Sequence, residues 1–345
     1  MYRLAKKLYV KFEWIFSLCF AALSKVLLKS KSHEIFLSYN SSQVHDGFGA
    51  QVHRIFSLAN TAAKFDFKLE KPEISQIAIH PLDKFQTLPE MKLYISKANL
   101  ELFLSSNFTS APKHAKLLCF DSLNFKALIK ILIIWRFLRK PIKVICRDAH
   151  IVSDFYVNNY STSLKDYFPH LINLEGRTSV ENTIYIHYRQ GPGGFSIYPG
   201  QKISRELNKS YFLNAAKSIL NNTDNPCRVI VFTDAPKEDK KFAPPDNQRQ
   251  LWEGTPGFAD GVLTFLGNNL EGYFNNKLPQ DKILGGIVVE RNHDPLMMIK
   301  AMSKAQYLII SRSSLSYVAA LLNPSARVYY PPEFWHPALK NWIKS

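Results

Sequence analysis

Four polar segments of the sequence carry side chains that could bind an anionic ligand. Each comes after an apolar run with the length and composition of a buried strand. Ligands of parallel α/β sheets bind at the loops that follow the carboxyl ends of the strands, so these segments are the places to look for chemistry. They are residues 46–51, 187–194, 233–234 and 311–316.

The segment IYIHYRQGPGG places an imidazole and a guanidinium two residues apart, at His187 and Arg189. Residues at this spacing point to the same side of a strand. A guanidinium can hold two phosphate oxygens at once, and a neighbouring imidazole suits the same ligand. We therefore predict that Arg189 binds a phosphate group. The alternative is that Arg189 pairs with a carboxylate in a domain interface.

The segment HDGFGAQ contains Gly47 and Gly49 and precedes a helical pattern. We expect these glycines to adopt positive φ and to bring the backbone close to a ligand at the helix N-terminus. A tight turn without a ligand is the alternative. In VIVFTDAP, Asp234 ends a buried strand. Its carboxylate is expected to bind a base or a ribose hydroxyl, and the alternative is a helix N-cap.

The segment SRSSLS joins an apolar strand pattern to an apolar helix pattern. Hydroxyls and free amides at a helix N-terminus favour phosphate binding, and the alternative is capping by a single serine. The serines are Ser311, Ser313, Ser314 and Ser316.

Familiar motifs for metals and dinucleotides are missing from the sequence. The glycine pair Gly47 and Gly49 is not followed by the third glycine of G-x-G-x-x-G, and neither a Walker motif nor G-x-S-x-G occurs. The 14 aspartates are never two apart, and none of the four cysteines forms C-x-x-C. We therefore predict no metal. The charge of a phosphorylated ligand would then be balanced by Arg189, by Arg312, and by amides at a helix N-terminus.

The elements that must position these segments alternate between strand and helix. The chain has 345 residues, which suits two domains. Strand-to-glycine-loop patterns occur near residues 35–49 and 180–194, which predicts an α/β fold with two doubly wound domains. We expect a basic, apolar helix over residues 1–32, a first domain over 33–177, and a second domain over 178–345 that ends in a helix.

The net charge of +16 is concentrated in two short segments. Residues 1–32 carry seven Lys/Arg and one Glu, and residues 113–147 carry nine Lys/Arg and one Asp, so these segments account for +6 and +8. Both border apolar runs, which favours an anionic membrane surface over nucleic acid. Residues 1–32 could instead form a helix packed on the domain, or a cleaved or spanning signal. The apolar run 131–135 is expected either in the core or in lipid.

Together, DGFGAQ, IHYRQG, VFTDA and MSKAQYLIISRSSLSYVAALLN resemble the GDP-fucose-dependent fucosyltransferases, most closely the bacterial α-1,2 type. The resemblance implies a GT-B fold and an inverting, metal-independent transfer. It implies that Arg189 binds the donor diphosphate, with His187 in the nucleotide pocket and Asp234 near the guanine or ribose. It also implies further site residues on both domains, namely Asp46, Gly47, Gly49, Gln51, Ser313, Ser314 and Ser316.

Two departures from the family pattern leave room for another nucleotide sugar. Gln190 stands where the family has a second arginine, and Pro192 stands where it has an aspartate. The sequence also has Leu315 in place of a small residue and Tyr317 in place of a tryptophan.

The sequence therefore predicts a glycosyltransferase that moves a sugar, fucose as the first hypothesis, to a hydroxyl of a glycan or lipid-linked glycan. Asp46 is the first candidate for the general base, with His53 and Glu271 as weaker ones. The expected location is the cytoplasmic face of a membrane, or a Golgi-type membrane if residues 1–32 are a signal anchor. The alternatives are a non-catalytic glycan- or membrane-binding protein and a nucleic-acid-binding protein.

Overall fold

The computed structural model describes most of the chain, and its contacts divide the chain into two compact units. The described residues are 34–39, 47–72, 108–172, 180–189, 207–235, 237–243, 246, 249, 258–265, 267–291 and 294–345. The first unit ends at Ile172, and the second begins at Asn173 and also includes His45–Ala50. The helix expected over 1–32 lies outside the described residues.

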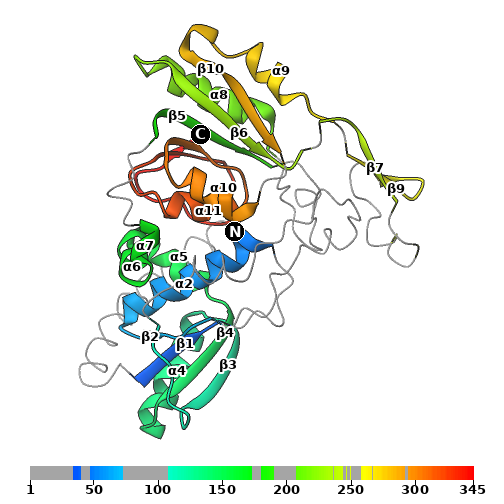
Figure 1. The fold of residues 1–345 in the computed structure, drawn as a ribbon. Coiled ribbons are helices and arrows are strands. Elements are labelled where there is room, and N and C mark those ends of the chain that lie inside the picture. The colour runs from blue at the N-terminus through cyan, green and yellow to red at the C-terminus, as the bar shows by residue number, and fades with distance from the viewer. Residues whose placement is uncertain are drawn as a thin grey trace, which may run out of the picture. The chain divides into compact units, whose positions relative to one another are not determined.

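The first unit contains a parallel four-stranded sheet with the strand order β2-β1-β4-β3 (Figure 1). Helix α2 packs its apolar positions into the core, including Val52, Ile55 and Phe56, as the helical spacing predicts. The strands are β1 (Ile35–Ser38), β2 (Lys68–Leu69), β3 (Lys116–Ser122) and β4 (Ile142–Asp148). The helices are α2 (Phe48–Phe65), α4 (Phe125–Leu138), α5 (His150–Phe155), α6 (Tyr160–Tyr167) and α7 (Pro169–Ile172).

Helix α4 lies within the second basic segment of the sequence, residues 113–147. The Asn124 side chain caps it by accepting from the backbone N–H of Ala127 at 2.9 Å. It ends at Arg139, whose φ of 49° is left-handed, two residues before Pro141. Of the run 131–135, Ile131, Leu132 and Trp135 are buried in the core, whereas Ile133 is 50% exposed. The expectation of a core position is therefore confirmed for Ile131, Leu132 and Trp135, and the expectation of lipid contact stays a prediction.

The second unit contains a parallel six-stranded sheet with the order β10-β6-β5-β11-β12-β13. Figure 1 shows α8 on one face of this sheet and α10 and α11 on the other, which is a doubly wound arrangement. The strands are β5 (Val180–Tyr188), β6 (Cys227–Thr233), β10 (Ile283–Arg291), β11 (Ala305–Ile309), β12 (Arg327–Tyr330) and β13 (Ile343–Lys344). The helices are α8 (Lys209–Asn221), α9 (Leu270–Asn275), α10 (Pro295–Met302) and α11 (Ser314–Leu321).

The strand order of this sheet reverses direction between β5 and β11. From β5 the chain adds β6 and then β10 on one side, and it then crosses to add β11, β12 and β13 on the other side. Open α/β sheets bind ligands at such a switch point, outside the carboxyl ends of the strands. The fold therefore marks the ends of β5 and β11 as the place for a ligand.

The structure corrects the sequence-based prediction at the C-terminus. The helix expected there is wrong, because residues Ile343–Lys344 form β13, which extends the sheet in parallel with β12. The amphipathic pattern of ALKNWIKS arises instead from Leu339 and Trp342, which are buried in the core. Between residues 240 and 265 the chain contributes an antiparallel sheet of β7 (Lys240–Phe242), β9 (Val262–Phe265) and β8 (Phe258–Ala259).

Within the described part of the chain, no helix combines the length and the apolar character needed to cross a membrane.

Candidate functional site

The carboxyl ends of β5 and β11 are joined by a side-chain hydrogen bond between His187 and Ser311. The His187 Nδ1 and Ser311 Oγ atoms lie 2.7 Å apart, and both residues are almost fully buried. Ile186 pairs with Ile309 across the two strands, so His187 comes one residue and Ser311 two residues after this pair. Two of the predicted segments therefore meet at the switch point of the sheet.

His187 is uncharged at neutral pH. Its pKa is lowered from 6.5 to about 3, chiefly by burial and also by the positive charge of Arg189, while Asp234 acts in the opposite direction. A neutral imidazole can both donate and accept a hydrogen bond, so His187 can fix Ser311 on one side while its other nitrogen serves a ligand or a neighbour.

Arg189 and Asp234 form an ion pair beside this bond. The Arg189 Nη1 and Asp234 Oδ2 atoms are 3.6 Å apart, and each side chain is 22% exposed. The sheet register explains the pair, since Tyr188 lies opposite Thr233 and the next residue of each strand is Arg189 and Asp234. The carboxylate partner of Arg189 thus belongs to its own unit. A partly exposed guanidinium held by one carboxylate keeps further N–H groups that can bind oxygen atoms of a ligand.

Asp234 does not supply the hydroxyl or carboxylate that closes the turn after β6. The Thr233 Oγ1 atom does so, by accepting from the backbone N–H of Ala235 at 2.9 Å. The Asp234 carboxylate is therefore positioned for Arg189 and for whatever binds beside it.

The serines at the start of α11 serve mainly the local fold. Ser313 is the N-cap and accepts from the backbone N–H of Leu315, and Ser316 donates to the carbonyl of Ser313 at 3.2 Å. Ser314 lies 3.1 Å from Nε2 of His336, a residue that the sequence analysis did not select. The structure thus realises the capping alternative for Ser313, and the backbone amides of the first turn remain the groups suited to an anion.

Arg312 is used within the fold. It is 8% exposed, its Nε donates to the carbonyl of Pro332 at 3.0 Å, and its Nη2 lies 3.4 Å from Glu333. These bonds orient its guanidinium toward the loop after β12.

The expectation that Gly47 and Gly49 adopt positive φ is wrong. Close packing constrains Gly49 instead. Among the described glycines, positive φ occurs only at Gly261, Gly285 and Gly286. A Cβ atom on Gly49 would lie 2.5 Å from the backbone nitrogen of Leu315, so no larger residue fits without a shift. Gly47 begins the turn into α2, because its carbonyl accepts from Ala50 at 3.0 Å.

Of the two other site residues predicted in this segment, Gln51 is among the described residues and Asp46 is not. Gln51 lies on α2 and is 4% exposed. Asp46, the first candidate for the general base, lies outside the described residues.

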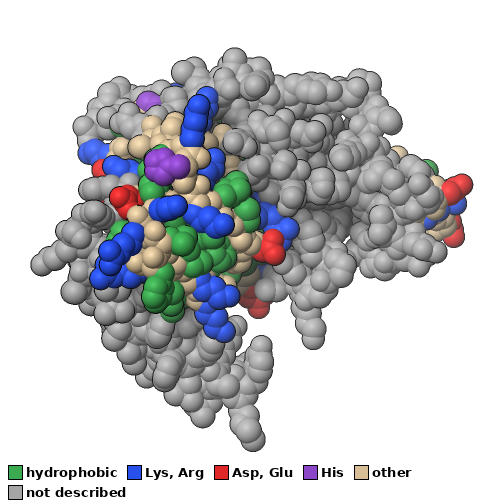
Figure 2. Space-filling view, turned by 90° about the horizontal axis from the view of Figure 1, so that it is seen from below, with side chains coloured by type: hydrophobic (Ala, Val, Ile, Leu, Met, Phe, Trp, Pro, Cys, Tyr) green, Lys and Arg blue, Asp and Glu red, His purple; other side chains and the backbone are tan. Residues whose placement is uncertain are grey.

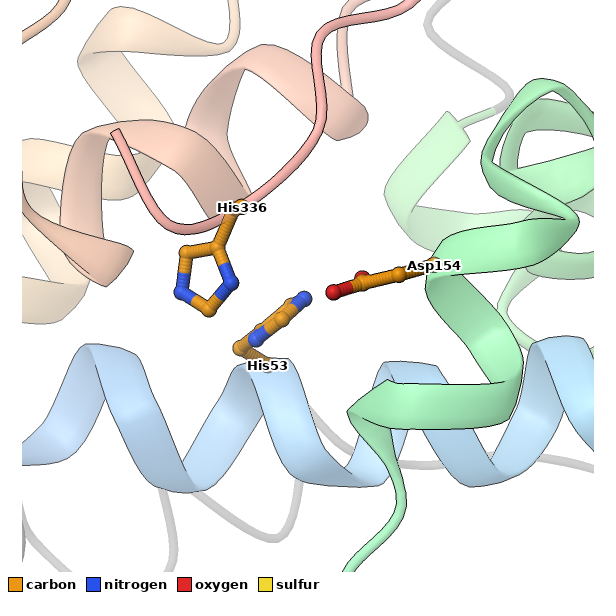
Figure 3. Close-up of side chains that lie close together, drawn as sticks. All are labelled: His53, Asp154 and His336. Carbon is orange, nitrogen blue, oxygen red and sulfur yellow. The ribbon is translucent and has the colours of Figure 1, made fainter. Parts of the chain in front are cut away.

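The first unit holds a cluster of titratable residues where β4 ends. Asp148 is the last residue of β4, and its carboxylate contacts Nδ1 of His150, the first residue of α5. Figure 3 shows His53 of α2 and Asp154 of α5 pointing toward one another, and their ligand atoms lie within 4.8 Å. The motif D-x-H directly after a predicted strand was the signal in the sequence for this cluster.

A chain of buried hydrogen bonds supports this cluster from one side of α2. The Tyr160 hydroxyl lies 2.8 Å from Ser57 Oγ, 2.6 Å from Ser153 Oγ and 3.3 Å from His53 Nε2. Asn60 continues the chain by donating to Ser153 Oγ at 2.9 Å. The spacing of His53, Ser57 and Asn60 puts them on one helix face, which makes α2 a carrier of buried polar groups as well as apolar ones.

The two weaker candidates for the general base have structural roles. Burial lowers the pKa of His53 to about 3, with the charge of His150 adding to the effect, so its imidazole is a weak base. Glu271 accepts two hydrogen bonds from Arg291, at 2.6 and 2.9 Å. These bonds lower the pKa of Glu271, which makes it a poor proton acceptor.

Comparisons with known proteins give distant structural likenesses. No family model matches the chain, and no curated protein matches it. A solved structure of POFUT1 with GDP has a TM-score of 0.45 and 10% identity, covering 86% of this chain and 97% of that one. POFUT1 with GDP-fucose gives 0.42 and 9%, covering 83% and 93%. E. coli ADP-heptose heptosyltransferase II gives 0.35 and 10%, covering 89% and 88%. At these values the likenesses assign neither a donor nor an acceptor to this chain.

Proposed function

We propose that the protein is a GT-B glycosyltransferase that binds a nucleoside-diphosphate sugar at the switch point of its second unit. The observation that carries this proposal is the pairing of His187 with Ser311 beside the pair of Arg189 with Asp234. A phosphate-binding guanidinium, a neutral imidazole and a carboxylate gather where an α/β sheet binds nucleotides. The resemblance of the four segments to GDP-fucose-dependent transferases makes GDP-fucose the first donor hypothesis.

In this proposal Arg189 neutralises the diphosphate as it leaves. The leaving group gains negative charge when its bond to the anomeric carbon breaks, and a fixed cation stabilises that charge. The amides at the start of α11 supply further donors. Asp234 orients the guanidinium and is placed to accept a hydrogen bond from the base or the ribose. We propose that the transfer inverts the anomeric centre and uses no metal.

A thermal-shift panel tests this function. Ligands that bind only the native state raise the melting temperature by mass action. The panel contains GDP, UDP, ADP and CMP, followed by the sugars of whichever nucleotide binds. We expect one nucleoside diphosphate and its sugar to raise the melting temperature in a dose-dependent way. No shift with any of them would overturn the proposal, whereas binding without transfer to any glycan would favour the non-catalytic alternative.

We also propose that the acceptor is lipid-linked and that the first unit contacts an anionic membrane surface. The outward face of α4 carries two large apolar side chains one turn apart, Ile133 and Phe137, which are 50% and 81% exposed. Exposed basic residues surround them, namely Lys126, Lys130, Arg136, Arg139 and Lys140. Figure 2 views the molecule from the side where α4 lies in Figure 1 and shows apolar side chains bordered by lysine and arginine. No ion pair is found for these five basic residues among the described part of the chain.

This arrangement suits the boundary between lipid headgroups and acyl chains. Each basic residue near an anionic surface contributes ~1 kcal/mol, and apolar side chains add to this by burial. The composition of residues 1–32 is similar, so we propose that both segments contribute. The protein would then be peripheral, on the cytoplasmic face of a membrane, or it would lie at a Golgi-type membrane if residues 1–32 are a signal anchor.

Vesicle sedimentation of the full chain tests the membrane contact. We expect binding to vesicles with anionic lipid, weaker binding to neutral ones, and a partial loss with salt. The double variant Ile133→Ser/Phe137→Ser and deletion of residues 1–32 should each weaken binding. Leu284→Ser, which changes a 62% exposed side chain on β10, is the matched control and should bind normally. Equal sedimentation of all variants would contradict the proposal, as would binding to arbitrary duplex DNA in preference to vesicles.

A further inference from the structure

Strand β3 forms one end of the parallel sheet in the first unit, and β4 is its one neighbour among the described strands. It is seven residues long and follows β4 in a single register from Lys116 to Ser122. Figure 1 shows β3 at the end of this sheet, beside β4. The outer edge of such a strand presents a row of backbone N–H and C=O groups that can pair with a strand of another chain.

The backbone of every second residue of β3 faces this outer edge. The N–H of Lys116 donates to the carbonyl of Pro141, on the β4 side, at 2.8 Å. Alternate residues of a parallel strand bond to the same neighbour, so Leu117, Cys119 and Asp121 direct their N–H and C=O groups outward. Their side chains are open as well, since Leu117 is 51% exposed, Cys119 is exposed, and the Asp121 side chain is 90% exposed.

The other end strands of the two parallel sheets have features that hinder pairing, and β3 does not share them. Strands β2 and β13 have only two residues each. Strand β10 is longer, but its register with β6 shifts between Ile283 and Ile287, where Gly285 and Gly286 have positive φ. Short end strands and bulges of this kind keep a sheet from adding strands of other chains. The regular, partly apolar edge of β3 is therefore the one suited to a partner.

We propose that β3 pairs antiparallel with β3 of a second copy of this chain, so that the two four-stranded sheets join across a two-fold axis. The charges of the strand favour this partner. Lys116 begins β3 and Asp121, which lies 4.0 Å from Arg147, is its last residue but one. An antiparallel copy brings the acidic end of each strand beside the basic start of the other, whereas a parallel copy would bring like charges together.

A lipid surface is a poorer partner for this edge than a strand. Contact with acyl chains would cover the exposed side chain of Leu117, but it would leave the outward N–H and C=O groups without hydrogen bonds. A second β3 satisfies the backbone groups and covers the apolar side chain at once. The pairing is therefore separate from the membrane contact proposed for α4.

Two of the three central registers of this pair put a carboxylate against an apolar side chain. The outward residues of the two strands must lie opposite one another, so the axis can pass through Leu118, Cys119 or Phe120. An axis at Cys119 places Asp121 opposite Leu117 of the second copy. An axis at Phe120 places Asp121 opposite Cys119 of the second copy. Both arrangements bury part of a charged group without an opposite charge.

An axis at Leu118 gives the complementary register. Leu118 then faces its own copy, and Leu117 faces Cys119 of the second copy, so these pairs are apolar. Lys116 faces Phe120 of the second copy, where its ammonium group can lie over the aromatic ring. We therefore expect the two-fold axis at Leu118.

Analytical ultracentrifugation of the full chain over a range of concentrations tests the pairing. We expect the mass to rise from one chain to two and to stop there, because a two-fold contact is closed. Leu117→Lys should weaken the dimer at least tenfold, since a charge on an edge strand opposes pairing. Leu284→Lys, the same change at a 62% exposed position of β10, is the matched control and should dimerise normally. The double variant Ile133→Ser/Phe137→Ser should also dimerise normally, because it changes only α4.

Circular dichroism of each variant shows that a loss of dimer is not a loss of fold. A single chain at every concentration would overturn the proposal. Equal dimerisation of folded Leu117→Lys and Leu284→Lys would also overturn it, because the contact would then lie elsewhere on the molecule.

Disulfide formation with oxidised glutathione tests the register. Opposite residues in a hydrogen-bonded pair have Cα atoms about 5.5 Å apart, within the roughly 4.4–6.8 Å that a disulfide spans. In a Cys19→Ser background, Leu117→Cys should therefore crosslink to Cys119 of the second copy, and Leu117→Cys/Cys119→Ser should not. Non-reducing electrophoresis measures the product. A crosslink through Cys119 without Leu117→Cys would contradict the axis at Leu118, and no crosslink in any of these variants would contradict pairing through β3.

Discussion

At the scale of single residues, the donor site depends on which side chains the sheet register places next to each other. Arg189 and Asp234 are 45 positions apart in the sequence and meet because β5 and β6 pair in parallel. His187 and Ser311 meet through the pairing of β5 with β11. The types of these residues indicated an anion site, but which side chains pair with one another follows only from the strand order.

Replacing Arg189 tests the phosphate-binding role directly. Arg189→Ala should lower kcat/KM by about 10²–10³-fold while the fold stays intact, because a charge-assisted donor to the leaving group is lost. Arg189→Lys should also be impaired, since an ammonium lacks the planar fork. Steady-state release of the nucleoside diphosphate measures both. Arg327→Ala, at the opposite end of the same sheet, is the control, and near-normal turnover by folded Arg189→Ala would refute the role.

Buried His187 should make the protein sensitive to acid. Its folded pKa of about 3 lies below the unfolded value of 6.5, so the unfolded state binds more protons between these values. Stability is therefore lost as pH falls below 6.5, by about 1.4 kcal/mol per pH unit from this group. His187→Gln should flatten that dependence. Urea unfolding at pH 7, 6 and 5 measures it, and parallel curves for the two proteins would contradict the burial of a neutral histidine.

At the scale of elements, α2 has two buried faces of different chemistry. Its apolar face was predictable from the spacing of Val52, Ile55 and Phe56, because burial of apolar side chains dictates that period. Its polar face was not, since Ser57 and Asn60 look like surface residues until α5 and α6 supply their partners. The short helices of residues 150–172 were missed for the same reason, as their sequence is rich in polar residues.

The hydroxyl of Tyr160 should contribute more to the free energy of unfolding than an ordinary tyrosine hydroxyl does. Tyr160→Phe leaves Ser57, Ser153 and His53 without a shared partner, and unsatisfied buried groups cost about 1–3 kcal/mol each. Tyr167→Phe removes the bond from a partly buried hydroxyl to the carbonyl of Phe67 and should cost about 1 kcal/mol. Chemical denaturation compares the two, and equal losses would show that the network adds nothing.

At the scale of the whole molecule, the two α/β units were predictable because strand and helix periods alternate clearly along the chain. The C-terminal helix was mispredicted because Leu339 and Trp342 pack into the core from turns, with a spacing that also suits a helix. The residues of the proposed donor site could be selected from the sequence by their types. The cluster at Asp148 and His150 was not selected, because its only signal in the sequence is a short D-x-H pattern and its contacts are created by the fold.

The proposed transfer should continue in excess EDTA. The leaving diphosphate is stabilised by Arg189 and by helix amides in this proposal, and the sequence has no D-x-D. Initial rates before and after chelation, with Mg²⁺ or Mn²⁺ added back, measure the effect. Loss of activity that either ion restores would show that a metal takes part.

The most direct measurement of the central claim is calorimetric titration of the nucleoside diphosphate selected by the thermal-shift panel. The wild type and Arg327→Ala should bind it with the same Kd and a stoichiometry of one per chain. Arg189→Ala should bind at least tenfold more weakly, because its phosphate contact is lost. Equal affinity of Arg189→Ala and the wild type, or no binding by the wild type, would contradict a nucleotide site at the ends of β5 and β11.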